Sequence, residues 1–246
     1  MADRDHPAPE LTAGRPAPAP AASRRAVLRG MGAIGAASVG VGALAACGSD
    51  DDTTSTSAAP KQAETVKPVA EIPALSGKDT AVTLDSGFVK ALGSLKLTPA
   101  PVGTAEISKA GVASFPITGG NVTYYTPGTE SPYVQGMIDH DGSGLSLTGG
   151  GKKVELTDFE VDPGKSVLTG KVTVDGKVAA ESAPLFFLDG RTLKPLETGA
   201  GNTAILEGTT VKLKQEAADL LNQTFGTDAL KAGFVIGIAK ITVNTA

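Results

Sequence analysis

The strongest constraint on the fold is a two-residue turn, Asp175-Gly176, between two alternating apolar and polar segments in residues 172–180. Asp-Gly favours the type I′ turn, whose twist matches that of two antiparallel strands, so this stretch predicts a β-hairpin. Alternation with period two recurs in residues 113–125, 152–162 and 166–174. Short strands with turn signals at this spacing predict a mainly β domain, an antiparallel β-sandwich or barrel.

Two stretches show helical periodicity instead. Apolar residues in residues 85–95 and 214–226 recur at spacings of three and four, and Gly226 stands where a helix would end. The two stretches also align with each other, the alignments starting at Val82 and Val211, and GTAEI then aligns with GIAKI. Each copy reads strand, short helix, loop, strand. This predicts either two related halves that close against each other, a pseudo-twofold repeat, or a chance match between simple compositions.

Residues 1–46 resemble an export signal. Arg24 and Arg25 precede an uncharged run of small residues, which ends in LAAC at Cys47. The paired arginines resemble a twin-arginine signal peptide and LAAC resembles a bacterial lipobox. These resemblances imply cleavage before Cys47, a lipid on that cysteine, and a lipoprotein anchored at the extracytoplasmic face of the bacterial cell membrane. A plain membrane anchor is the alternative interpretation.

The remainder divides into a linker and one domain. Residues 47–74 begin with the chain's only cysteine, so no intrachain disulfide forms, and their Ser, Thr, Ala and Pro content predicts a disordered linker. Residues 75–246 have the length of a single β-rich domain. The net charge of −4 argues against nucleic-acid binding, which needs a basic face. We expect a monomer that contacts the membrane through its lipid anchor alone.

Enzyme motifs are missing from residues 47–246, which contain no G-x-S-x-G, S-x-x-K or H-E-x-x-H. A hydrolase would have to use His140, the only histidine of this part, with a second catalytic group within hydrogen-bond reach. Zinc bound by Cys and His ligands is excluded by count. The chain has no tryptophan, whereas sugar clefts usually stack aromatic rings on their ligands. We therefore expect a binding protein and no enzyme.

Residues 124–144 contain every tyrosine of the chain, Tyr124, Tyr125 and Tyr133, together with Met137 and His140. On a strand Tyr124 and Tyr125 point to opposite faces, so both cannot enter one pocket. By the same rule Met137 and His140 lie on opposite faces. One interpretation is a ligand pocket at one end of the sheet that uses phenol, thioether or imidazole groups. The other is that the tyrosines cover a sheet edge and Met137 packs in the core.

The stretch DHDGSG within this window fits half of a calcium-binding loop. Asp139, Asp141 and Ser143 occupy the first three ligand positions and Gly144 the invariant glycine, but the closing glutamate is replaced by Gly150. The alternative is a tight Asp/Gly turn before the strand GLSLTGG.

The stretch VQGMIDHDGSGLSLTGGGKKVELTDFEVDPGKSVLTGKVTV and the later LEGTTVKLKQEAADLLNQTFG resemble the HtaA-type domain over about residues 82–243. This family comprises β-rich sandwich domains with short helices in haem-uptake proteins of actinobacterial cell surfaces. The resemblance implies a haem held by a tyrosine on the first helix and supported by a histidine of the middle block, where His140 falls. The family's tyrosine position is Ala91 here and its leading tryptophan is missing.

A haem site in this chain would therefore have to be rebuilt around Tyr124, Tyr125 or Tyr133. Two functions remain open from the sequence. The first is binding of a small, haem-type ligand near Tyr133 and His140. The second is a structural or protein-interaction module of the cell envelope without a small ligand, for which a large exposed apolar patch would be the sign.

Overall fold

The computed structural model describes residues 65–245, so the predicted export arginines Arg24 and Arg25 and the predicted lipidation site Cys47 lie outside the described residues. The described part is mainly β, as the sequence predicts, with one antiparallel sheet of 13 strands and two α-helices. The elements in chain order are β1 (Ala70–Ile72), β2 (Lys78–Leu84), α1 (Ser86–Ser94), β3 (Thr98–Gly103), β4 (Glu106–Ile107), β5 (Val112–Pro116), β6 (Gly119–Tyr124), β7 (Val134–Gly149), β8 (Lys152–Asp162), β9 (Val167–Val174), β10 (Lys177–Asp189), the 3-10 helix η1 (Gly190–Thr192), β11 (Glu197–Gly199), β12 (Thr203–Leu213), α2 (Gln215–Phe225) and β13 (Val235–Asn244).

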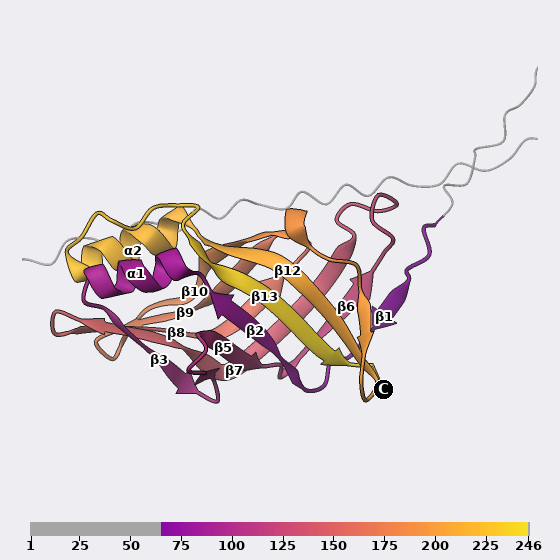
Figure 1. Ribbon diagram of the computed structural model, residues 1–246, viewed down its shortest axis with the longest axis horizontal. Coiled ribbons are helices and arrows are strands. Elements are labelled where there is room, and N and C mark those ends of the chain that lie inside the picture. Colours follow the sequence, from indigo (N-terminus) through magenta and orange to yellow (C-terminus); the bar gives the residue numbers. More distant parts are fainter. Residues whose placement is uncertain (1–64, 246) are drawn as a thin grey trace, which may run out of the picture. The chain divides into compact units, whose positions relative to one another are not determined.

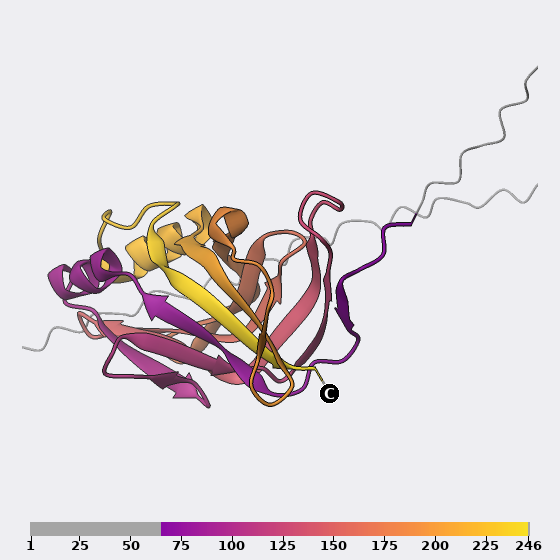
Figure 2. The same cartoon turned by 45° about the vertical axis from the view of Figure 1, so that its right-hand side comes forward.

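The sheet curls around an interior. Its strand order is β1-β6-β7-β8-β9-β10-β12-β13-β2-β5-β4, with β3 added to β7 and β11 added to β12. Strands β5 and β6 are separated by only Ile117 and Thr118, yet β5 pairs with β2 and β6 pairs with β7. This bent segment therefore connects the two sides of the sheet, and the curl is visible in both views (Figures 1 and 2).

The predicted hairpin is confirmed as the β9–β10 turn. Val174 pairs with Lys177, and Asp175 and Gly176 between them have φ of 48° and 78°. Both φ values are positive, as a type I′ turn requires. The turn joins β9 and β10, which are neighbours in the middle of the strand order, so it helps to set their register.

Both predicted helices are confirmed, and their ends follow the local sequence. Asp85 accepts hydrogen bonds from the N–H groups of Gly87 and Phe88, which makes it the N-cap of α1. Helix α2 ends at Gly226, whose φ of 66° is left-handed. Both helices lie at the same end of the sheet (Figure 1). Within residues 65–245 neither reaches the length and hydropathy of a membrane-spanning helix.

The internal repeat holds for the strand–helix units and fails beyond them. Strands β2 and β12 are each antiparallel to β13 and flank it on either side, so they run in the same direction and lead into α1 and α2 at one end. After the helices the copies differ, because β3 pairs with β7 whereas β13 pairs with both β12 and β2. The two copies share β13 and are not separate halves that close against each other.

The sheet begins within the segment predicted to be a disordered linker. Strand β1 (Ala70–Ile72) pairs with β6, and Leu75 is buried in the core with its N–H donating to the carbonyl oxygen of Gly120. The polar composition of residues 47–74 obscured this strand. Short as it is, its backbone bonds to β6 hold it in place.

The prediction of a tight turn at DHDGSG is wrong. Strand β7 runs through this stretch as one strand with a bulge between His140 and Gly144. The bulge keeps its N–H groups bonded to neighbouring side chains. Asp141 donates to the hydroxyl of Thr118, and Gly142 donates to the carboxylate of Asp158, each at 2.9 Å. On both sides of the bulge β7 pairs with β8, so the strand continues to Gly149 and does not reverse.

Candidate functional site

The interior of the curled sheet contains a cavity of about 220 Å³. At the helix end the sheet and helices pack closely, with Ala218, Val154 and Val172 fully covered. Toward the other end the lining side chains become half-buried, among them Ile72, Tyr133, Leu206 and Ile241. The cavity is therefore closed beneath the helices, and it reaches the surface where Tyr133, Ser166 and Gly190 line it.

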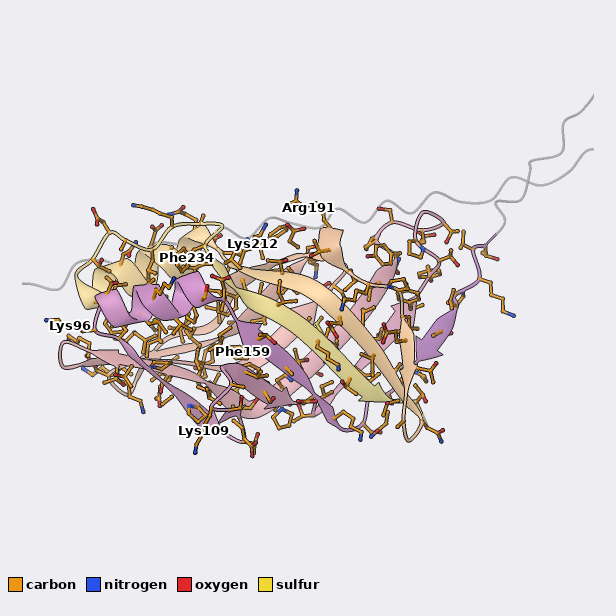
Figure 3. All side chains as sticks on the ribbon, viewed as in Figure 1. Lys96, Lys109, Phe159, Arg191, Lys212 and Phe234 are labelled. Atoms are coloured by element: carbon orange, nitrogen blue, oxygen red, sulfur yellow. The ribbon has the colours of Figure 1, made fainter. Side chains whose placement is uncertain are left out.

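Strand alternation explains why the lining is apolar. In β2 the residues Thr80, Val82 and Leu84 face inward, and in β13 the residues Ala239, Ile241 and Val243 do the same. Where a bulge adds a residue, the phase shifts. The lining residues of β12 change from even to odd numbers at its bulge between Glu207 and Thr209. Phe159 of β8 lies in the same interior (Figure 3).

His140 is the most deeply buried polar group of the cavity wall, with 1% of its surface exposed. Its Nδ1 lies 2.9 Å from the carbonyl oxygen of Pro116, and because that oxygen only accepts, Nδ1 carries the proton. Its Nε2 lies 3.2 Å from the hydroxyl of Thr80. Burial lowers the pKa of His140, although the Pro116 carbonyl and the Asp139 carboxylate act in the opposite direction. The ring is neutral near pH 7, and both of its nitrogens are already bonded.

Two of the three tyrosines line the cavity. Tyr124 and Tyr133 pack edge to face with ring centroids 6.0 Å apart, Tyr124 being buried and Tyr133 half-buried. Burial raises the pKa of Tyr133, and the neighbouring Tyr124 raises it further. Tyr125 follows Tyr124 on the opposite face and does not line the cavity, as strand alternation predicts.

The remaining candidate site residues do not form a second group around the cavity. Met137 lies on the face opposite His140, as strand alternation predicts, and it does not line the cavity, so the structure does not bring this candidate ligand residue together with His140. Of the half calcium loop, Ser143 is fully buried and its hydroxyl donates to the carbonyl oxygen of His140, whereas Asp141 is exposed. Among residues 65–245 there is no group of three or more His, Cys, Asp or Glu side chains that could hold a metal ion. Asp139, the first residue of the half calcium loop, therefore belongs to no such group.

The charged residues beside the cavity opening carry no signal that identifies them in the sequence. Asp189 at the end of β10 accepts hydrogen bonds from Arg191, Nη2 at 2.6 Å, and from Lys212, Nζ at 2.7 Å. These contacts hold the pKa of Asp189 far below its ordinary value, the Arg191 side chain being the largest cause. Arg191 and Lys212 lie near each other on one side of the molecule (Figure 3). Asp189 and Arg191 lie two residues apart at the start of η1, and the register between β10 and β12 brings Lys212 to them.

The comparisons with known proteins concern the fold. The C-terminal domain of HtaA from Corynebacterium glutamicum has a TM-score of 0.48 at 14% identity, over 69% of this chain and 97% of that domain. The domain-swapped dimer of a histidine-to-alanine variant of that domain has a TM-score of 0.38 at 15% identity, over 65% and 90% of the two chains. No protein-family model and no curated protein matches the sequence. The function is therefore argued from this chain's own residues.

Proposed function

We propose that the domain binds a small, mainly apolar ligand inside the curled sheet. The observation that carries the proposal is the cavity of about 220 Å³. Its wall is mostly apolar, and the lining side chains come from strands that face each other across the curled sheet. A dry apolar cavity of about 150 Å³ is large enough to hold benzene. Sites for drug-sized ligands measure about 300–1,000 Å³. The cavity thus suits a single hydrocarbon chain or one small ring system.

The residues present do not fit haem, the ligand that the family resemblance implies. His140 cannot offer a free nitrogen to iron while Nδ1 is bonded to Pro116 and Nε2 to Thr80. The raised pKa of Tyr133 disfavours the phenolate that would replace the family's tyrosine ligand. The volume is also small for a macrocycle. We expect a haem titration of the purified protein to give no shift of the Soret band, and a shift would restore haem as the ligand.

We infer the location of the domain from the resemblance of the N-terminal residues, which end in LAAC at Cys47, to a lipoprotein export signal. With a lipid on Cys47, the domain would sit at the extracytoplasmic face of the membrane, close to a source of apolar molecules. We expect the Cys47→Ser variant to leave the membrane fraction, and retention there would count against the anchor.

The binding proposal is tested by filling the cavity. Ala204 on β12 lines the cavity and is half-buried, so Ala204→Phe places a ring where the ligand would lie. Ala81 on β2 is also half-buried but does not line the cavity, which makes Ala81→Phe the matched control. The measurement is the fluorescence of the neutral apolar dye N-phenyl-1-naphthylamine. We expect the wild type and Ala81→Phe to bind the dye, and Ala204→Phe to bind it about tenfold more weakly.

Equal binding by all three proteins would place the dye outside the cavity, and no binding to the wild type would remove the proposal. The folding of each variant is checked by thermal unfolding, since an overpacked interior costs about 1–3 kcal/mol.

A further inference from the structure

The cavity opening continues into a shallow hollow on the surface. Tyr133, Ser166, Leu188 and Gly190 line both the cavity and the hollow, and the hollow adds Phe187, Asp189 and Arg191. The boundary between the apolar interior and the charged surface therefore lies at this opening. A ligand that passes through it would touch both environments at once.

The most deeply buried polar pair of the cavity wall, His140 and Thr80, offers no free donor to an anionic group. His140 and Thr80 bond to each other, and the second ring nitrogen of His140 donates to Pro116. An ionised group moved this deep would lose its water without gaining donors, at a large free-energy cost. Near His140 the cavity therefore suits the apolar part of a ligand, and an anionic part is better placed at the opening.

Beside the opening, the cluster of Asp189, Arg191 and Lys212 carries an excess of positive charge. One carboxylate, Asp189, with 8% of its side chain exposed, pairs with both Arg191 and Lys212. Two cations against one anion leave an excess of one positive charge. The side chain of Arg191 is 82% exposed, and its guanidinium bonds to Asp189 through Nε and Nη2 only, which leaves further N–H groups for a ligand. The β8–β9 turn adds the pair Lys165–Asp162, and the Glu160 carboxylate also acts on Lys165, so the available cation beside the opening is Arg191.

Resting on the binding function above, we propose that the ligand is a single-chain amphiphile with an anionic head group. Its hydrocarbon chain lies in the cavity toward His140, and its head group lies at the opening beside Tyr133 and accepts hydrogen bonds from Arg191. The free N–H groups of a guanidinium suit a carboxylate or a phosphate equally, because both accept charge-assisted hydrogen bonds.

The test compares two compounds with the same chain, octanoate and 1-octanol, as competitors of the neutral dye on the full chain at low salt. Arg191→Gln removes the excess charge while Lys212 continues to pair with Asp189, so the variant keeps its fold. Lys109 is exposed on the turn before β5, far from Arg191 (Figure 3), which makes Lys109→Gln the matched control. Octyl phosphate as a third competitor shows whether carboxylate or phosphate is preferred.

We expect octanoate to displace the dye at lower concentration than octanol from the wild type and from Lys109→Gln. In Arg191→Gln, octanoate should bind about three- to fivefold more weakly, as for one exposed ion pair, with octanol unchanged. Dye binding with equal displacement by octanol and octanoate, or an equal loss for both in Arg191→Gln, would overturn the head-group assignment and leave the cavity function standing. A wild type that binds neither dye nor amphiphile would overturn both.

Discussion

At the scale of single residues, His140 shows how a side chain that suggests catalysis or metal binding becomes a structural group. Its position in the sequence, amid aspartates and tyrosines, favours a site residue. Its position in the structure, bonded at both nitrogens and in edge contact with the Phe115 ring at 6.4 Å between centroids, makes it part of the wall. The hydrogen bond to Pro116 also ties β7 to the end of β5, where the bent segment crosses between the two sides of the sheet.

The lowered pKa of His140 predicts a pH-dependent stability. In the unfolded chain a histidine titrates near about 6.5, whereas the folded protein keeps His140 neutral to lower pH. Below about pH 6.5 the unfolded state therefore binds more protons, and the free energy of unfolding falls as the pH falls, by at most about 1.4 kcal/mol per pH unit. The fall ends once the pH drops below the folded pKa.

Urea unfolding at several pH values between 5 and 7 measures this effect. We expect the wild type to lose stability toward pH 5 and His140→Gln to lose less, because the variant has no group that titrates at this position. Asp139 and Asp141, the charged neighbours that favour the protonated ring, are present in both proteins. Identical slopes for the two proteins would show that His140 is not held neutral.

At the scale of elements, the bulges and glycines decide which side chains reach the interior. Gly136 on β7 has a φ of 120°, and a Cβ at this position would overlap the carbonyl oxygen of Asn121 on β6. The close approach of β6 and β7 thus depends on a residue without a side chain. These two strands carry Tyr124, Ile138 and His140, so the approach also positions one wall of the cavity.

We expect Gly136→Ala to lower the free energy of unfolding by about 2–3 kcal/mol, because the new Cβ meets backbone and the left-handed φ disfavours alanine. The matched control is Gly93 in α1, where a Cβ would meet nothing within 4 Å. Gly93→Ala should raise stability by up to about 1 kcal/mol through helix propensity. Chemical denaturation measures both, and similar effects of the two substitutions would contradict the argument.

Elements were predictable where one local rule governs them. The Asp175-Gly176 hairpin, the two helices and the opposite orientation of Tyr124 and Tyr125 all follow from periods and turn preferences within a few residues. The continuous β7 did not follow, because its pairing with β8 across the bulge, and the hydrogen bonds from the bulge to Thr118 and Asp158, follow no local rule.

At the scale of the whole molecule, the cavity could not be predicted because it belongs to no single stretch. The tyrosine- and histidine-containing window supplies one wall, through Tyr124, Tyr133 and His140. The facing wall comes from β2, β12 and β13, whose contribution depends on the curl of the sheet and on bulges that change the inward phase. Long-range register also brings Lys212 to the locally formed pair of Asp189 and Arg191 beside the opening.

An enclosed ligand site predicts that binding stabilises the whole domain. The lining residues come from strands across the entire sheet, so unfolding of any large part of it would release the ligand. A ligand that binds only the folded state raises the free energy of unfolding by about 2.7 kcal/mol at one hundred times its dissociation constant. We therefore expect octanoate to raise the unfolding temperature of the wild type in a concentration-dependent way, by several degrees at one hundred times its dissociation constant.

The Ala204→Phe variant separates this linkage from a general effect of amphiphiles. If the ligand acts from within the cavity, the filled variant should show a much smaller rise at the same octanoate concentrations, while Ala81→Phe should follow the wild type. Thermal unfolding followed by circular dichroism measures all three. Equal rises would mean that octanoate acts on the surface, and the stability of the curled sheet would then be independent of what its interior holds.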